Sequence, residues 1–183
     1  MTAMLKGVAI RSTLRAVERL HGRDAVTRVK QAVPEAARAT LEHVLPVEWY
    51  PVEVSAALHA AIREVIGAGS WEASHALGVE AAKLEFTGLY KALIRAVQYD
   101  TVWDRMERVW TTYNTTGKPD WFERGRGRAR GTIIGVAGYN EGIWQSVAGR
   151  CEGILVLCGA RGANVVTKNP SSTRCDFEAM WLE

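Results

Sequence analysis

This chain of 183 residues has few side chains of the kinds that usually carry catalysis or bind metals. It contains only four histidines and three cysteines. No two cysteines stand at a chelating spacing, no Ser, His and Asp set has a recognisable arrangement, and there is no phosphate-binding loop. The sequence therefore disfavours an enzyme, predicts no metal site and identifies no cofactor.

Long apolar runs and an excess of one charge are also missing. The longest uncharged apolar stretch, residues 153–160, is far shorter than the ~20 residues that cross a bilayer, so we expect no membrane span. The 23 basic and 20 acidic side chains give a net charge of +3, which is too balanced to drive nucleic-acid binding. An odd cysteine count without a secretion signal in residues 1–17 predicts a reduced, cytoplasmic protein.

What the chain does contain is a helical first part followed by a sheet. Apolar residues recur at helical spacing, which predicts helices over 8–20, 24–33, 35–43, 51–66, 70–84, 89–97 and 101–113. From residue 120 onward the period changes to two, interrupted by a helix at 143–157. The pattern predicts one α+β domain over residues 1–183, with N-terminal helices packed on a C-terminal sheet and one intervening helix.

An unusual basic run opens the sheet region. Arginine occupies every even position from 124 to 130, namely Arg124, Arg126, Arg128 and Arg130, with glycine or alanine between. On one extended strand these four side chains would share a face and form an anion-binding row for a phosphate or carboxylate. The more ordinary interpretation, which we favour, is a solvated row paired with carboxylates such as Asp176 and Glu178 on a neighbouring strand.

Aromatic residues supply the candidate ligand-binding surface. The chain has seven tryptophans, and Trp103 and Trp110 stand seven positions apart, so they share one face of their predicted helix. Together with Tyr90 and Tyr113, these rings are candidates to line a ligand cavity between helices and sheet, or a dimer surface. Core packing is the default alternative.

The histidines and cysteines offer few candidates for haem ligation or a disulfide. His59 and His75 lie on predicted helices and are the candidates for an axial haem ligand, although no partner motif supports that role. Cys151 and Cys158 would lie ~10 Å apart along one helix and so form no disulfide. Gly149 and Gly153 on the same helix would allow a neighbouring helix to approach closely.

Several segments together resemble a known superfamily. The order of predicted helices and strands is one feature of the likeness. The others are the glycine-containing helix from Ile143 to Gly149, the stretch Trp110-Thr-Thr-Tyr113-Asn-Thr-Thr-Gly117 and the closing segment from Cys175 to Trp181. The chain resembles the superfamily that joins haem nitric-oxide-binding domains, vinyl-reductase-like domains and TRAPP vesicle-tethering subunits, and within it a myxobacterial family. The resemblance implies an antiparallel sheet, a tendency to dimerise, and a pocket for haem, acyl chains or small hydrophobic molecules.

The chain departs from the superfamily at the functional positions. Haem-binding relatives hold the propionates with a Tyr-x-Ser-x-Arg motif, whereas Tyr113-Asn-Thr-Thr-Gly117 lacks the serine and the arginine, and the acylated cysteine of the tethering subunits has no counterpart. We therefore predict a non-enzymatic sensory or adaptor domain, homodimeric, that binds a small apolar ligand or a protein partner in bacterial signalling. The alternatives are a haem-dependent gas sensor and an anion or nucleic-acid binder that uses the arginine row, with nucleic acid disfavoured.

Overall fold

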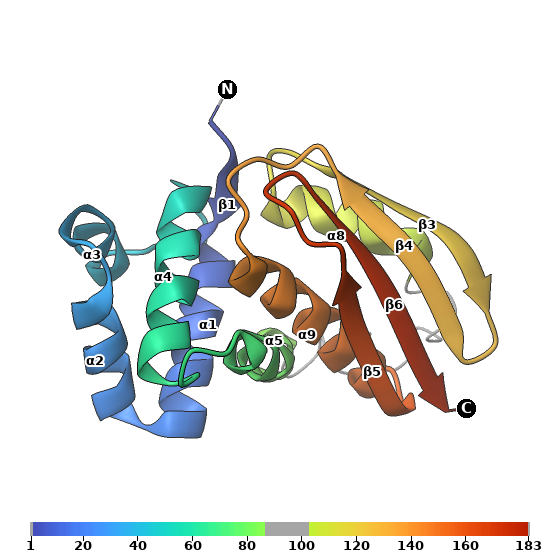
Figure 1. Cartoon of the computed structure of the whole chain (residues 1–183), viewed down its shortest axis with the longest axis horizontal. Helices are drawn as coiled ribbons and strands as arrows, with labels where there is room; N and C mark the ends of the chain where they lie inside the picture. The colour runs from blue at the N-terminus through green and yellow to red at the C-terminus, as the bar shows by residue number, and fades with distance from the viewer. Residues whose placement is uncertain (1, 87–102, 183) are drawn as a thin grey trace.

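A computed structural model describes residues 2–86 and 103–182. Helices from the first half of the chain form one side of the molecule and a four-stranded antiparallel sheet forms the other, with helices α5 and α9 running between them (Figure 1). The predicted α+β fold, with N-terminal helices packed on a C-terminal antiparallel sheet and one helix inserted in it, is confirmed.

The helices within residues 2–86 begin and end at residues that the sequence marks as helix starts and stops. They are α1 (Gly7–His21), α2 (Arg23–Ala32), α3 (Glu35–Glu42), α4 (Val52–Val65) and α5 (Glu72–Glu85). Gly22 ends α1 with a φ of 83°, a conformation that glycine adopts at little cost. Pro51 precedes the first residue of α4, and the hydroxyl of Ser70 accepts a hydrogen bond from the Glu72 N–H at the start of α5.

One predicted helix lies outside the described residues and another is shorter than expected. The helix predicted over 89–97, together with Tyr90, falls in the range that the structure does not describe. The helix predicted over 101–113 is a 3₁₀ turn, η1 (Trp103–Arg105), followed by α8 (Met106–Tyr113). Trp103 and Trp110 are both buried, at 3% and 4% exposure.

The main sheet has the strand order β3-β4-β6-β5 and is antiparallel throughout. Its strands are β3 (Lys118–Gly125), β4 (Arg128–Ile134), β5 (Arg161–Lys168) and β6 (Arg174–Leu182). Alternate residues of β6, from Cys175 to Trp181, are buried, as expected for a sheet with one covered face. A second sheet pairs β1 (Met4–Lys6) with β2 (Trp49–Pro51); the sequence analysis missed these strands because three residues are too few to show a period.

Helix α9 (Glu141–Leu157) packs on α5 at very short range, which glycine makes possible. A Cβ atom added at Gly149 would lie 2.1 Å from the carbonyl oxygen of His75, and one at Gly78 would lie 2.3 Å from that of Ser146. The close approach predicted from Gly149 and Gly153 is therefore present in the structure. Asn140 caps α9, since its side-chain oxygen accepts a hydrogen bond of 3.0 Å from the Ile143 N–H.

Two hydrophobic clusters form the core, one among the N-terminal helices and one between the sheet, α8 and α9. Leu58, Ile62 and Leu77 are fully buried in the first cluster, and Trp144 and Phe177 in the second. Of the helices in the described ranges, none combines the length and the apolar character needed to cross a membrane.

Candidate functional site

A pocket of about 90 Å³ lies where the two hydrophobic clusters meet, and we call it the central pocket. Helices α1, α4, α5, α8 and α9 all contribute to its wall. Its lining residues are Leu5, Ala9, Thr13, Ser55, His59, Ala82, Glu85, Phe86, Met106, Val109, Trp110, Tyr113, Asn114, Tyr139, Ile143, Ser146, Val147, Arg150, Cys151 and Ile154. Most of this wall is apolar, with a small number of polar groups, which is the usual character of a ligand site.

The polar part of the wall is dominated by one ion pair, between Arg150 of α9 and Glu85 of α5, which we call the Arg150–Glu85 pair. The two side chains are 17% and 8% exposed. The guanidinium also donates to the carbonyl oxygen of Ala9 at 2.9 Å and to the hydroxyls of Ser12 and Thr13, all on α1. One buried pair therefore links three helices at the pocket wall.

Glu85 has further partners that fix its carboxylate. Ser12 Oγ donates to Oε1 at 2.5 Å, and the phenol of Tyr113 donates to Oε2 at 2.7 Å. Burial raises the pKa of Tyr113 above its usual range, and the neighbouring Glu85 carboxylate raises it further. Tyr113, a predicted ligand-binding residue, thus lies on the pocket wall as a neutral donor that supports the ion pair.

His59 is a buried, neutral imidazole on the same wall. It is 2% exposed, and its Nδ1 lies 2.9 Å from the hydroxyl of Ser74 on α5. Burial, and then the positive charge of Arg150, lower the pKa of His59 to about 3. The ring is therefore uncharged at neutral pH and is held in one orientation by Ser74.

Aromatic rings also line the pocket, but Trp103, a predicted ligand-binding residue, lies elsewhere. Trp110 and Tyr139 lie with ring centroids 6.1 Å apart, and the Trp110 indole donates to the Thr116 carbonyl at 2.8 Å. Trp103 does not line the pocket; its ring packs against that of Trp121 in the core under the sheet, with centroids 4.0 Å apart and planes tilted by 41°. The structure thus places Trp110 and Tyr113 at the pocket and Trp103 in the core, while Tyr90 lies outside the described residues.

The arginine row is not one strand face. β3 ends at Gly125, Arg126 lies in the hairpin turn, and β4 begins at Arg128, so the run folds back on itself. Glycine at 127 adopts a φ of 71°, which the tight turn requires and which the alternating pattern did not reveal.

The exposed arginines of β4 have carboxylate partners. Arg128 pairs with Glu123 at 2.8 Å, and Arg130 pairs with Glu178 at 3.0 Å. Asp176, expected as another partner of the row, pairs instead with Arg174. The geometry agrees with the solvated, paired row more than with a four-guanidinium clamp.

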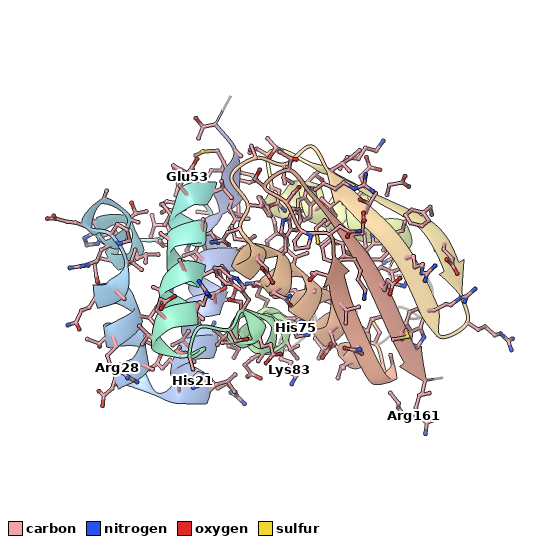
Figure 2. All side chains as sticks on the ribbon, viewed as in Figure 1. His21, Arg28, Glu53, His75, Lys83 and Arg161 are labelled. Atoms are coloured by element: carbon pink, nitrogen blue, oxygen red, sulfur yellow. The ribbon has the colours of Figure 1, made fainter. Side chains whose placement is uncertain are left out.

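The other histidines lie away from the pocket wall. His75 Nε2 lies 3.0 Å from the Glu152 carboxylate of α9, and Figure 2 shows His21 at the outer end of α1. Within residues 2–86 and 103–182, no three His, Cys, Asp or Glu side chains gather as a metal site would require. His59 is thus the histidine of this part of the chain that a ligand in the central pocket would meet.

The sequence analysis missed Glu85 and Arg150. A usable signal was present: Arg150 is the one basic residue of α9, a helix otherwise rich in glycine and apolar side chains. A basic side chain inside such a helix needs a buried acidic partner, because an unpaired buried charge is strongly unfavourable. The identity of that partner, 65 positions earlier in the chain, depended on the packing of α9 against α5.

Comparison with solved structures places this architecture among known folds, although no family model and no curated protein sequence matches the chain. An Fe(II) unliganded H-NOX protein from K. algicida matches with a TM-score of 0.73 at 11% identity, over 98% of this chain and 97% of that chain. An oxygen-binding H-NOX domain related to soluble guanylate cyclases matches with a TM-score of 0.69 at 12% identity, over 98% and 96%. Over nearly its full length, this chain therefore has an H-NOX-like fold.

Proposed function

We propose that this protein is a non-enzymatic sensory domain that binds a compact, mostly apolar ligand in the central pocket. The observation that carries the proposal is the position of the pocket: helices of both core clusters line it, so an occupant would contact both halves of the fold. A ligand that binds one arrangement of these helices better than another shifts the population toward it. The H-NOX-like fold supports a sensory role.

A haem-dependent gas sensor is the second candidate, and the fold likeness supports it more directly than it supports an adaptor for a protein partner. One similar structure, of TM-score 0.70 and 11% identity, concerns haem distortion in the H-NOX family. His59 would be the axial ligand, because it lines the pocket and Ser74 orients the ring through Nδ1.

The described residues nevertheless do not fit haem. Drug-sized ligands already occupy pockets of ~300–1,000 Å³, and the central pocket measures about 90 Å³. Its only guanidinium among the described residues belongs to Arg150, which is engaged by the Glu85 carboxylate. A propionate would have to displace a carboxylate that three groups already hold. The geometry thus supports a smaller ligand best.

Absorption and native mass spectra of the purified protein test both candidates. We expect no Soret band and a small co-purified mass that is released on denaturation. Val147→Phe, which introduces a ring into the pocket wall, should abolish the released mass, whereas Val156→Phe on the exposed side of α9 is the matched control. A Soret band lost in His59→Ala would establish the haem candidate instead. A folded protein that neither releases a mass nor responds to any small ligand would contradict the proposal.

We also propose an oligomeric state and a biological setting for this protein. We expect a homodimer, as the superfamily resemblance implies, and a role in bacterial signalling. Membership of the myxobacterial family stays a prediction. Light scattering coupled to size-exclusion chromatography decides the first point. A mass of one chain at micromolar concentration would rule out a stable dimer.

A further inference from the structure

The charges on the wall of the central pocket compensate each other. Of the described lining residues, the titratable ones are His59, Glu85, Tyr113, Tyr139, Arg150 and Cys151. Glu85 and Arg150 carry opposite full charges and are paired with each other. Burial keeps the other four neutral, since it lowers the pKa of His59 and raises the pKa of Cys151 and of both tyrosines.

The two charged groups also have several further hydrogen-bond partners. Arg150 donates to three groups of α1 besides Glu85, and Glu85 accepts from Ser12 and Tyr113 besides Arg150. An ionic ligand that entered the central pocket would lose its hydration shell. It would find no unpaired opposite charge there to compensate for that loss. A neutral ligand would leave the pair intact.

Two hydroxyls in the pocket, by contrast, are available to a ligand. Ser55 of α4 and Ser146 of α9 are each 4% exposed and both line the pocket. Neither side chain has a hydrogen-bond partner within the described part of the chain, although buried hydroxyls usually have one. A ligand with one oxygen function would satisfy such a hydroxyl, which can donate or accept.

We propose that the central pocket selects an uncharged molecule of a few heavy atoms with a single hydroxyl or carbonyl group, such as a short alcohol, aldehyde or ketone, and that the Arg150–Glu85 pair excludes ionic analogues. This inference rests on the proposed function and specifies its ligand class. The small volume agrees with it, because an apolar cavity of ~150 Å³ accommodates benzene and the central pocket is about 90 Å³.

The exclusion of ionic analogues, which we call the charge rule, can be tested with three probes of one carbon skeleton: isobutanol, isobutyrate and isobutylamine. NMR titration would follow the indole N–H signal of Trp110, a pocket residue, assigned with Trp110→Phe. In the wild-type protein we expect isobutanol to bind at least about tenfold more tightly than either ion. Replacing both serines, Ser55→Ala and Ser146→Ala, should lower the affinity for isobutanol by about tenfold.

A charge variant sharpens the test. Glu85→Gln keeps the shape of the side chain and leaves the Arg150 guanidinium uncompensated, so the ratio of isobutyrate to isobutanol affinity should rise at least about tenfold. Glu123→Gln makes the same chemical change at the Arg128 ion pair on the sheet and should leave that ratio unchanged.

Failure of the proposed ligand class and failure of the proposed function give different results. Equal wild-type affinities for isobutanol and isobutyrate would overturn the charge rule while leaving a working pocket. A folded wild-type protein that binds none of the three probes would overturn the proposed function together with the inference. Should Glu85→Gln fail to fold, the wild-type ranking of the probes decides alone.

Discussion

Arg150 and Glu85, 65 positions apart in the chain, form a buried ion pair that closes one side of the central pocket and joins α9 to α5. Through the same guanidinium, α9 is also bonded to α1. The pair thus contributes both to the folding of the helical half and to the electrostatic character of the pocket.

Removing one partner of this pair should be costly. Arg150→Met leaves the Glu85 carboxylate buried without its cation, and we expect a loss of about 3–5 kcal/mol in the free energy of unfolding. The double variant Glu85→Leu with Arg150→Met should recover much of that loss. Urea denaturation of the wild type and of both variants measures the loss and the recovery. Arg130→Met, at the exposed pair with Glu178, is the control and should cost less than about 1 kcal/mol.

The contact between Gly149 and His75 predicts a second large effect. Gly149→Ala places a methyl group against backbone, 2.1 Å from a carbonyl oxygen, so α5 and α9 must separate. We expect a destabilisation of about 3 kcal/mol or more. Gly125→Ala is the matched control, because its Cβ would meet only the Arg128 side chain at 3.9 Å. Equal unfolding midpoints for the two variants would contradict the observed helix packing.

His59 should make stability depend on acid. Because its pKa is lowered from 6.5 to about 3, the unfolded chain binds a proton in this interval that the native protein does not. The free energy of unfolding therefore falls as the pH drops from 6.5 toward 3, by up to ~1.4 kcal/mol per pH unit from this residue, and the contribution is fully present above 6.5. The stability difference between wild type and His59→Gln, measured across this range, isolates the effect. A constant difference would show that the ring is not buried.

The arginine hairpin should tolerate charge reversal. Arg126 lies exposed in the turn and Arg128 makes only a surface ion pair, so Arg126→Glu with Arg128→Glu should change the free energy of unfolding by no more than about 1 kcal/mol. Circular dichroism checks folding, and titration with a nucleic acid at two salt concentrations checks the anion-binding alternative. Loss of the folded state would show a structural role, and a steep salt dependence would revive the alternative.

The three thiols should differ in reactivity, with none in a disulfide. Burial raises the pKa of all three thiols, to about 12 for Cys151 and Cys175, but Cys158 is partly accessible at the end of α9. Alkylation of the native protein near pH 7.5 should therefore modify Cys158 first, and denaturant should expose all three. Mass spectrometry resolves the order. A disulfide between Cys151 and Cys158 would contradict the helix that carries them.

Much of the fold followed from local patterns in the sequence. The helical spacing of apolar residues, the turn at Gly22 and the switch to alternation in the last third each reflect interactions between residues close along the chain. These patterns predicted the helices α1 to α5 and α9 and the position of the sheet. They also indicated that α9 would pack closely on another helix, because glycines at 149 and 153 remove side chains from one of its faces.

What only the tertiary structure decided is which distant residues meet. The four arginines alternate in sequence, yet a turn at Gly127 folds them into a hairpin, because glycine tolerates a backbone that no period reveals. Trp103 and Trp110 share a helical spacing, yet one packs under the sheet and the other lines the pocket. The Arg150–Glu85 pair forms because α5 and α9 cross within the reach of a side chain. Such contacts depend on how whole helices and strands pack against one another. Interactions between residues that are close in sequence do not determine that packing.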